Sequence, residues 1–100
     1  MVQITYNPRE HFLCAVGHAD SAEAGHDLVC AAVSAIMYLL VSFVQKEENS
    51  YFELNHGKAV AFCRPADGRQ EITREFFQTV FDSFLLLAQT YPKNVSVHVV

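Results

Sequence analysis

The stretch DLVCAAVSAIMYLLVSFVQ, residues 27–45, decides the fold. No charged side chain occurs from Leu28 to Val44, and the helix that this stretch favours is apolar on nearly all sides. Asp27 is a good capping residue for the start of such a helix. We therefore expect a helix from Asp27 to about Gln45 that a sheet buries, with a second subunit as a further candidate to cover it.

The apolar run is close to the lower limit for a bilayer span, which is about 17 residues. We expect no membrane role, however, because Cys30, Ser34 and Ser42 interrupt the run. A chain of 100 residues also needs one buried helix in order to form a core at all.

Before this helix, two short segments show the alternation of strands. Residues 2–6, VQITY, and residues 11–17, HFLCAVG, both alternate with a period of two. Between them, NPRE at 7–10 is a turn sequence, since Asn favours turn initiation and Pro fixes its own φ. We expect the two segments to pair as an antiparallel hairpin, with Gly17 ending the second strand and His18 emerging from it.

After the helix, residues 51–56 and 58–63 are expected to form a second hairpin around NHG. A second helix, from about residue 72 to 91, carries an apolar stripe on one side, and NVSVHVV at 94–100 alternates as a last strand. The order is β-β-α-β-β-α-β. We interpret it as a single α+β domain over residues 1–100, whose antiparallel or mixed sheet packs against two helices.

Composition and charge exclude several classes of protein. Apolar side chains make up 51% of the chain and charged ones 18%, as is typical of a globular domain. The net charge of −4 excludes a dominant electrostatic grip on nucleic acid phosphates. The three cysteines form no Cys-x-x-Cys pair and follow no signal peptide, so we expect a cytoplasmic protein with reduced thiols.

Cys30 lies in the first turn of the expected helix, a position that favours chemistry. Backbone N–H groups are unpaired there and the helix dipole favours the reactive thiolate, although the carboxylate of Asp27 opposes it. The same N–H groups can hold the oxyanion of a tetrahedral intermediate. His18, at a strand end, is a candidate general base, and Ser34 lies on the same helix face one turn deeper.

Each of these residues also has a purely structural interpretation. A cysteine among Val, Ala and Leu is commonly a small buried apolar residue, and we expect Cys14 and Cys63 in the core for this reason. Asp27 can be only a cap, and Ser34 can bond back to a carbonyl one turn earlier. His18 can be a solvated residue at a strand end.

Other histidines compete with His18. His26 lies four residues before Cys30 and can also reach the thiol, so spacing alone does not choose between the two histidines. A zinc site built from His18, His26, Cys30 and one further ligand would lack the closely spaced ligand pairs of structural zinc sites, so we expect no metal. The remaining histidines, which lie near turns or at exposed strand positions, are assigned no role: His11, His56 and His98.

GHA at 17–19 and GHDLVCAAVS at 25–34 together resemble the signature of the Prp family of ribosomal-processing cysteine proteases. The resemblance implies a small cytoplasmic α+β homodimer. It further implies an endopeptidase that removes the N-terminal extension of large-subunit ribosomal protein twenty-seven in bacteria, without a cofactor and without direct contact to nucleic acid. Residues 19–26 match a segment of the family thought to move when substrate binds.

The resemblance also implies roles for single residues. The family's catalytic pair falls on His18 and Cys30, which decides against His26. The Asp and the Ser of the family motif fall on Asp27 and Ser34, where supporting rather than covalent roles are implied.

Two other functions stay open from the residues alone. A non-catalytic ribosome-assembly dimer, which binds a ribosomal protein without cutting it, predicts that Cys30→Ala leaves function intact. A thiol redox sensor predicts a stable oxidised form of Cys30, but the expected burial of Cys14 and Cys63 leaves it no resolving partner. For a protease, the apolar first helix and the Phe-rich second helix predict a groove that takes apolar residues of the substrate.

Overall fold

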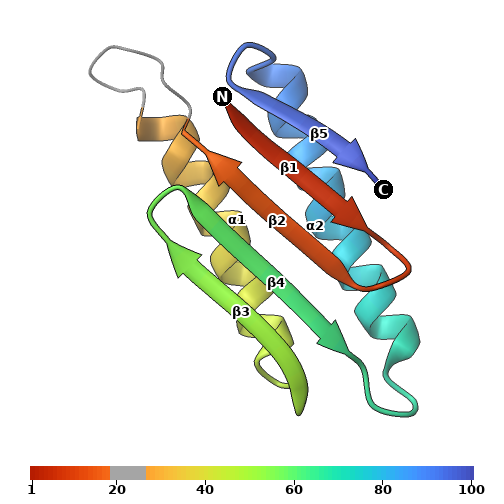
Figure 1. Ribbon diagram of the computed structural model, residues 1–100. Coiled ribbons are helices and arrows are strands. Elements are labelled where there is room, and N and C mark those ends of the chain that lie inside the picture. Colours follow the sequence, from red (N-terminus) through yellow and green to blue (C-terminus); the bar gives the residue numbers. More distant parts are fainter. Residues whose placement is uncertain (19–26) are drawn as a thin grey trace.

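The computed structural model describes residues 1–18 and 27–100 and confirms the expected order of elements (Figure 1). The largest differences from the expected bounds are two residues, at the starts of the third strand and the second helix. The elements in chain order are β1 (Val2–Asn7), β2 (Phe12–Gly17), α1 (Asp27–Val44), β3 (Asn49–Asn55), β4 (Lys58–Arg64), α2 (Gln70–Thr90) and β5 (Val95–Val99).

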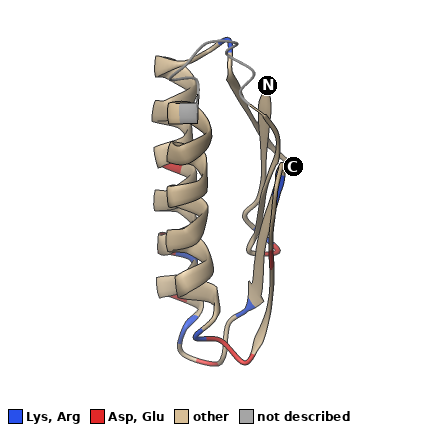
Figure 2. Cartoon of the chain, turned by 90° about the vertical axis from the view of Figure 1, so that its left-hand side faces the viewer, with Lys and Arg blue, Asp and Glu red and all other residues tan. Residues whose placement is uncertain are grey.

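The strands form one five-stranded sheet in the order β3-β4-β2-β1-β5. The pairs β1–β2, β2–β4 and β3–β4 are antiparallel, while β1 and β5 run parallel, with Val2 opposite Val95. The sheet is therefore mixed. Figure 2 shows both helices on the same face of the sheet, so the molecule has two layers, in agreement with the α+β class predicted from the sequence.

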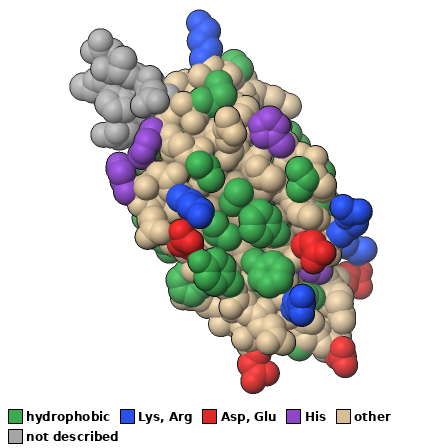
Figure 3. Space-filling model, viewed as in Figure 1, with side chains coloured by type: hydrophobic (Ala, Val, Ile, Leu, Met, Phe, Trp, Pro, Cys, Tyr) green, Lys and Arg blue, Asp and Glu red, His purple; other side chains and the backbone are tan. Residues whose placement is uncertain are grey.

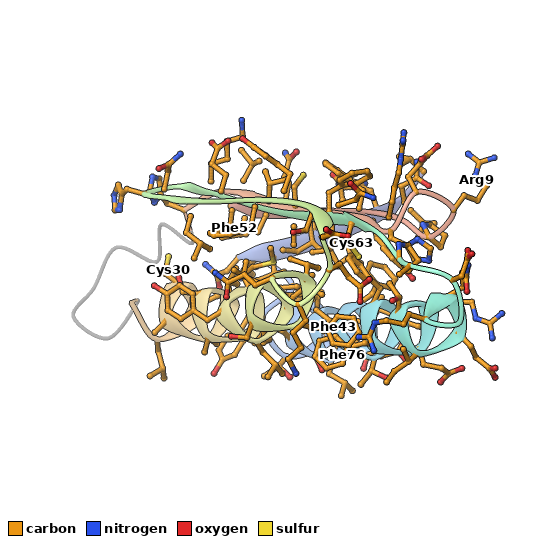
Figure 4. The ribbon with its side chains drawn as sticks, turned by 90° about the horizontal axis from the view of Figure 1, so that it is seen from below. Arg9, Cys30, Phe43, Phe52, Cys63 and Phe76 are labelled. Carbon is orange, nitrogen blue, oxygen red and sulfur yellow. The ribbon has the colours of Figure 1, made fainter. Side chains whose placement is uncertain are left out.

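The core lies between the sheet and the helices. Successive strand residues point to opposite faces, so alternate residues of β1 and β2 enter the core. The fully buried side chains that fill it include Ile4, Leu13, Met37, Leu40, Phe77 and Phe84. The stacked rings of Phe43 and Phe76, with centroids 4.3 Å apart, join the two helices (Figure 4).

The helix that decided the fold is covered on one side only. The side of α1 that faces the sheet and α2 is buried, whereas Leu28, Tyr38 and Leu39 are exposed large apolar side chains. Within one chain, the sheet and α2 therefore cover only part of the apolar surface of α1. Among the described residues, no helix is long and apolar enough to cross a membrane.

The prediction that Cys14 lies in the core is wrong. Its neighbours Leu13 and Ala15 belong to the buried core, so Cys14 points to the opposite face, the one that no helix covers. Apolar side chains gather on this uncovered face of the sheet (Figure 3). Both sets of alternate residues in HFLCAVG are largely apolar. The pattern therefore does not show which set faces the core. Cys63 is fully buried, as predicted.

A buried carboxylate joins the end of α1 to the start of α2. Glu47 is 5% exposed, accepts a hydrogen bond of 3.0 Å from the backbone N–H of Ala66 and pairs with the guanidinium of Arg69. These bonds, that from Arg69 first, hold the pKa of the Glu47 carboxyl below its ordinary value. Arg69 in turn lies over the ring of Phe43, 6.0 Å from its centroid.

Candidate active site

A cavity of about 600 Å³ opens between α1 and the hairpin formed by β3 and β4. His18, Cys30 and Ser34 all line it, although they come from a strand end and from two turns of a helix. The structure thus brings three of the four predicted site residues to one space. The side chain of Asp27, the fourth, lies outside the described part of the structure, as do His26 and the segment 19–26.

Cys30 occupies the first turn of α1, which begins at Asp27. Its side chain is half-buried, packs against the core and points from α1 toward the sheet (Figure 4). The first four N–H groups of a helix have no partner within the helix, and the positive end of the helix dipole lies there. The thiol is thus placed where backbone groups favour negative charge.

β2 ends at Gly17, and His18 follows directly after it. Gly17 occupies a place that no residue with a side chain can take. Gly17 has a φ of +108°, and a Cβ atom there would lie 2.2 Å from the carbonyl oxygen of Met1. The N–H of Gly17 donates a 2.9 Å hydrogen bond to the carbonyl of Gly57. The exposed side chain of His18 therefore leaves the sheet at the rim of the cavity.

The turn between β3 and β4 supplies a residue that the sequence analysis left without a role. The rings of His18 and His56 lie with centroids 4.6 Å apart and planes tilted by 41°. His56 also lines the cavity. The NHG turn is the sequence signal that could have pointed to His56. Its closeness to His18, however, depends on the pairing of β2 with β4, which joins segments distant in the chain.

The walls of the cavity are mostly uncharged. Val33, Met37, Tyr38 and Leu54 provide apolar surface, and Lys58 is the only described lining residue with a fixed charge. Among the described residues, no three His, Cys, Asp or Glu side chains are arranged to hold a metal ion. The cavity therefore combines apolar walls with polar groups, among them His18, Ser34 and Asn55.

Of the three cysteines, only Cys30 lines the cavity. Burial raises the pKa of the Cys63 thiol to about 11, so this thiol is protonated at neutral pH. Cys14 belongs to the uncovered face of the sheet. The arrangement therefore offers an accessible thiol at a helix start and imidazole groups on the same cavity, which are the groups that nucleophilic acyl transfer needs.

Comparison with known proteins gives a consistent result. The model of the family described as cysteine protease Prp matches residues 1–96. Two relatives are named ribosomal processing cysteine protease Prp. The one from Staphylococcus aureus is 26% identical over 86 residues, which are 82% of this chain and 79% of that protein. The one from Mycoplasma genitalium is 27% identical over 95 residues, or 95% and 94% of the two chains.

The fold is also found in solved structures. The crystal structure of the S. aureus ribosomal processing protease Prp in complex with a covalently linked product peptide superposes with a TM-score of 0.77. The superposition covers 100% of both chains at 20% sequence identity. This likeness supports the mixed sheet with two helices on one face.

Proposed function

The chain belongs to the Prp family of cysteine proteases, and we propose that it cleaves peptide bonds with Cys30 as nucleophile and His18 as general base. One observation carries this assignment: His18 and Cys30 line the same cavity, whereas Cys63 is buried and Cys14 faces away. The choice of His18 rather than His26 rests on the resemblance of the GHA motif to the family signature.

The proposed reaction proceeds in two stages. His18 takes the proton of Cys30, and the thiolate attacks the scissile carbonyl carbon to give a tetrahedral oxyanion, which backbone N–H groups of the first turn of α1 stabilise. The protonated His18 then gives its proton to the leaving amine as the C–N bond breaks. A water molecule, deprotonated by His18, attacks the thioester and releases the acid and the free thiol.

Asp27 and Ser34 are proposed to support this reaction without forming covalent bonds. The half-buried hydroxyl of Ser34 lies one turn after Cys30 on the cavity wall, where it can donate a hydrogen bond to bound substrate. Asp27 is the first residue of α1, a position that orders the turn carrying the nucleophile.

The substrate that we propose is the N-terminal extension of large-subunit ribosomal protein twenty-seven. Two relatives bear the name ribosomal processing cysteine protease, and the similar S. aureus protein was crystallised with a covalently linked product peptide. The apolar wall residues Met37, Tyr38 and Leu54 favour apolar side chains next to the scissile bond. Charged residues at that place should lower the rate of cleavage.

We also propose that the protein acts as a homodimer. α1 exposes Leu28, Tyr38 and Leu39, and no charged residue occurs from Leu28 to Val44. In this proposal the enzyme is cytoplasmic, needs no cofactor and acts on a protein substrate. It makes no direct contact with nucleic acid.

Cleavage of a synthetic peptide that spans the extension, followed by mass spectrometry, tests the proposal. We expect a single cut by the wild type and by Cys14→Ala, and no cut by Cys30→Ala or His18→Ala. Cys14→Ala is the matched control, since it removes a thiol outside the cavity. Cleavage by Cys30→Ala would overturn the assignment of the nucleophile. Binding without cleavage by the wild type would favour the ribosome-assembly function instead.

A further inference from the structure

The turn that joins β3 to β4 reaches His18 and surrounds part of its ring. The last pair between β2 and β4 is Val16 with Lys58, and the Gly17 N–H donates to the Gly57 carbonyl at 2.9 Å. The backbone immediately before His18 is therefore bonded to the tip of the turn. The position of the turn and the position of His18 are fixed to each other.

Two residues of the turn contact the His18 imidazole. A Cβ atom at position 57 would lie 2.8 Å from Nε2 and 3.0 Å from Cε1 of His18, so the glycine gives room to that edge of the ring. Gly57 has a φ of +81°, which also favours glycine. Against the ring itself lies the imidazole of His56, with centroids 4.6 Å apart.

A group that fixes the base is needed at this site. Cysteine and serine proteases commonly hold the catalytic histidine with a third side chain, because the imidazole must be aligned with the nucleophile. Among the described residues that line the cavity there is no carboxylate. The titratable or charged described groups that line the cavity with His18 are Cys30 and Tyr38 on α1 and His56 and Lys58 on the hairpin.

We propose that His56 is a positioning residue, whose ring packs against His18 in a tilted contact and holds it in the orientation that accepts the proton of Cys30. This inference rests on the proposed function of His18 as the base. This contact requires an aromatic ring at position 56 and does not require that ring to exchange a proton. Offset or tilted aromatic pairs contribute enough to hold an exposed side chain in one orientation.

Kinetics of three variants on the extension peptide test the proposal. We expect His56→Ala to lower kcat about three- to tenfold with little change in KM, because the ring contact acts on the base and not on substrate binding. His56→Phe keeps the ring and should restore kcat to within about twofold of the wild type. The matched control is His98→Ala, which removes an exposed histidine on β5.

An unchanged kcat for His56→Ala would overturn the proposal, and so would a His56→Phe variant as slow as His56→Ala. These results differ from a failure of the proposed function, in which the wild type does not cut or His18→Ala still does. A nuclear Overhauser effect between the ring protons of His18 and His56, measured without substrate in Cys30→Ala, is the second readout. We expect to observe it, and its absence would overturn the ring contact whatever the kinetics.

Discussion

Cys30 and Cys63 are thiols of the same chemistry in opposite surroundings. Cys30 lies half-buried on the cavity at a helix start, while Cys63 is fully buried with its pKa raised to about 11. Only a thiolate reacts rapidly with an alkylating reagent, and only when the reagent can reach it. The difference between the two residues is therefore directly measurable.

We predict that iodoacetamide at neutral pH modifies Cys30 in the folded protein and leaves Cys63 unmodified until urea unfolds the chain. Peptide mapping by mass spectrometry gives the rate at each cysteine. His18→Ala should slow the modification of Cys30 and leave that of Cys14 unchanged, so Cys14 is an internal control. Rapid modification of Cys63 in the folded protein would contradict the burial described above.

Glu47 makes stability depend on pH in a defined direction. Because Arg69 and the Ala66 N–H lower the pKa of Glu47 in the folded state, the stabilisation is complete above the ordinary glutamate pKa and is lost as pH falls through the lower folded value. We predict that Glu47→Gln lowers the free energy of unfolding at neutral pH by about 1–2 kcal/mol, since it leaves part of a buried network unpaired.

Urea unfolding at a series of pH values tests this prediction. The difference between the wild type and Glu47→Gln should be constant around neutral pH and should shrink below about pH 4, where the unfolded glutamate binds a proton. The neighbouring exposed residue provides the matched control Glu48→Gln, which should change stability little at any pH. A difference that grows in acid would show that the sign is wrong.

At the scale of elements, the contact between the two helices has a clear central pair. Phe43 and Phe76 stack with ring centroids 4.3 Å apart, and Phe43 belongs to the buried core. We predict that Phe43→Ala lowers the free energy of unfolding by about 3 kcal/mol, because it opens a cavity between α1 and α2. Phe52→Ala on the edge strand β3, at a residue 41% exposed, is the control and should cost about 1 kcal/mol or less. Equal losses measured by denaturant unfolding would contradict this account.

The elements themselves were largely predictable from the sequence, because each carries a strong local signal. The uncharged stretch after Asp27 and the alternation of VQITY need no tertiary information. The strand order was not predictable in the same way, since β1 pairs with β5 and β2 with β4 across long stretches of chain. Two features could not be read from local sequence. Cys14 sits in a segment that is apolar at both phases, so its side of the sheet is not fixed by the pattern. The contact between His56 and His18 depends on the pairing of β2 with β4.

At the scale of the whole molecule, the exposed side of α1 should mediate the proposed homodimer. We predict that the wild type sediments as a dimer and that Leu39→Glu shifts it to a monomer, because a charge would be buried without a partner. Analytical ultracentrifugation over a range of concentrations measures this. Leu86→Glu, at an exposed leucine on α2, is the matched control and should leave the dimer intact. Dissociation by Leu86→Glu alone would move the interface to α2.

The parallel pairing of β1 with β5 has a consequence for the timing of folding during translation. Val2 lines the cavity and pairs with Val95, so β1 is held in place by β5, a strand that is synthesised after all the elements that line the cavity. Contacts between such distant segments form slowly, because the intervening loop must close first. While residues 95–99 are still inside the ribosomal exit tunnel, a nascent chain has its nucleophile but an incomplete sheet. We therefore expect the cavity to reach its final form only after β5 has been synthesised and has paired with β1.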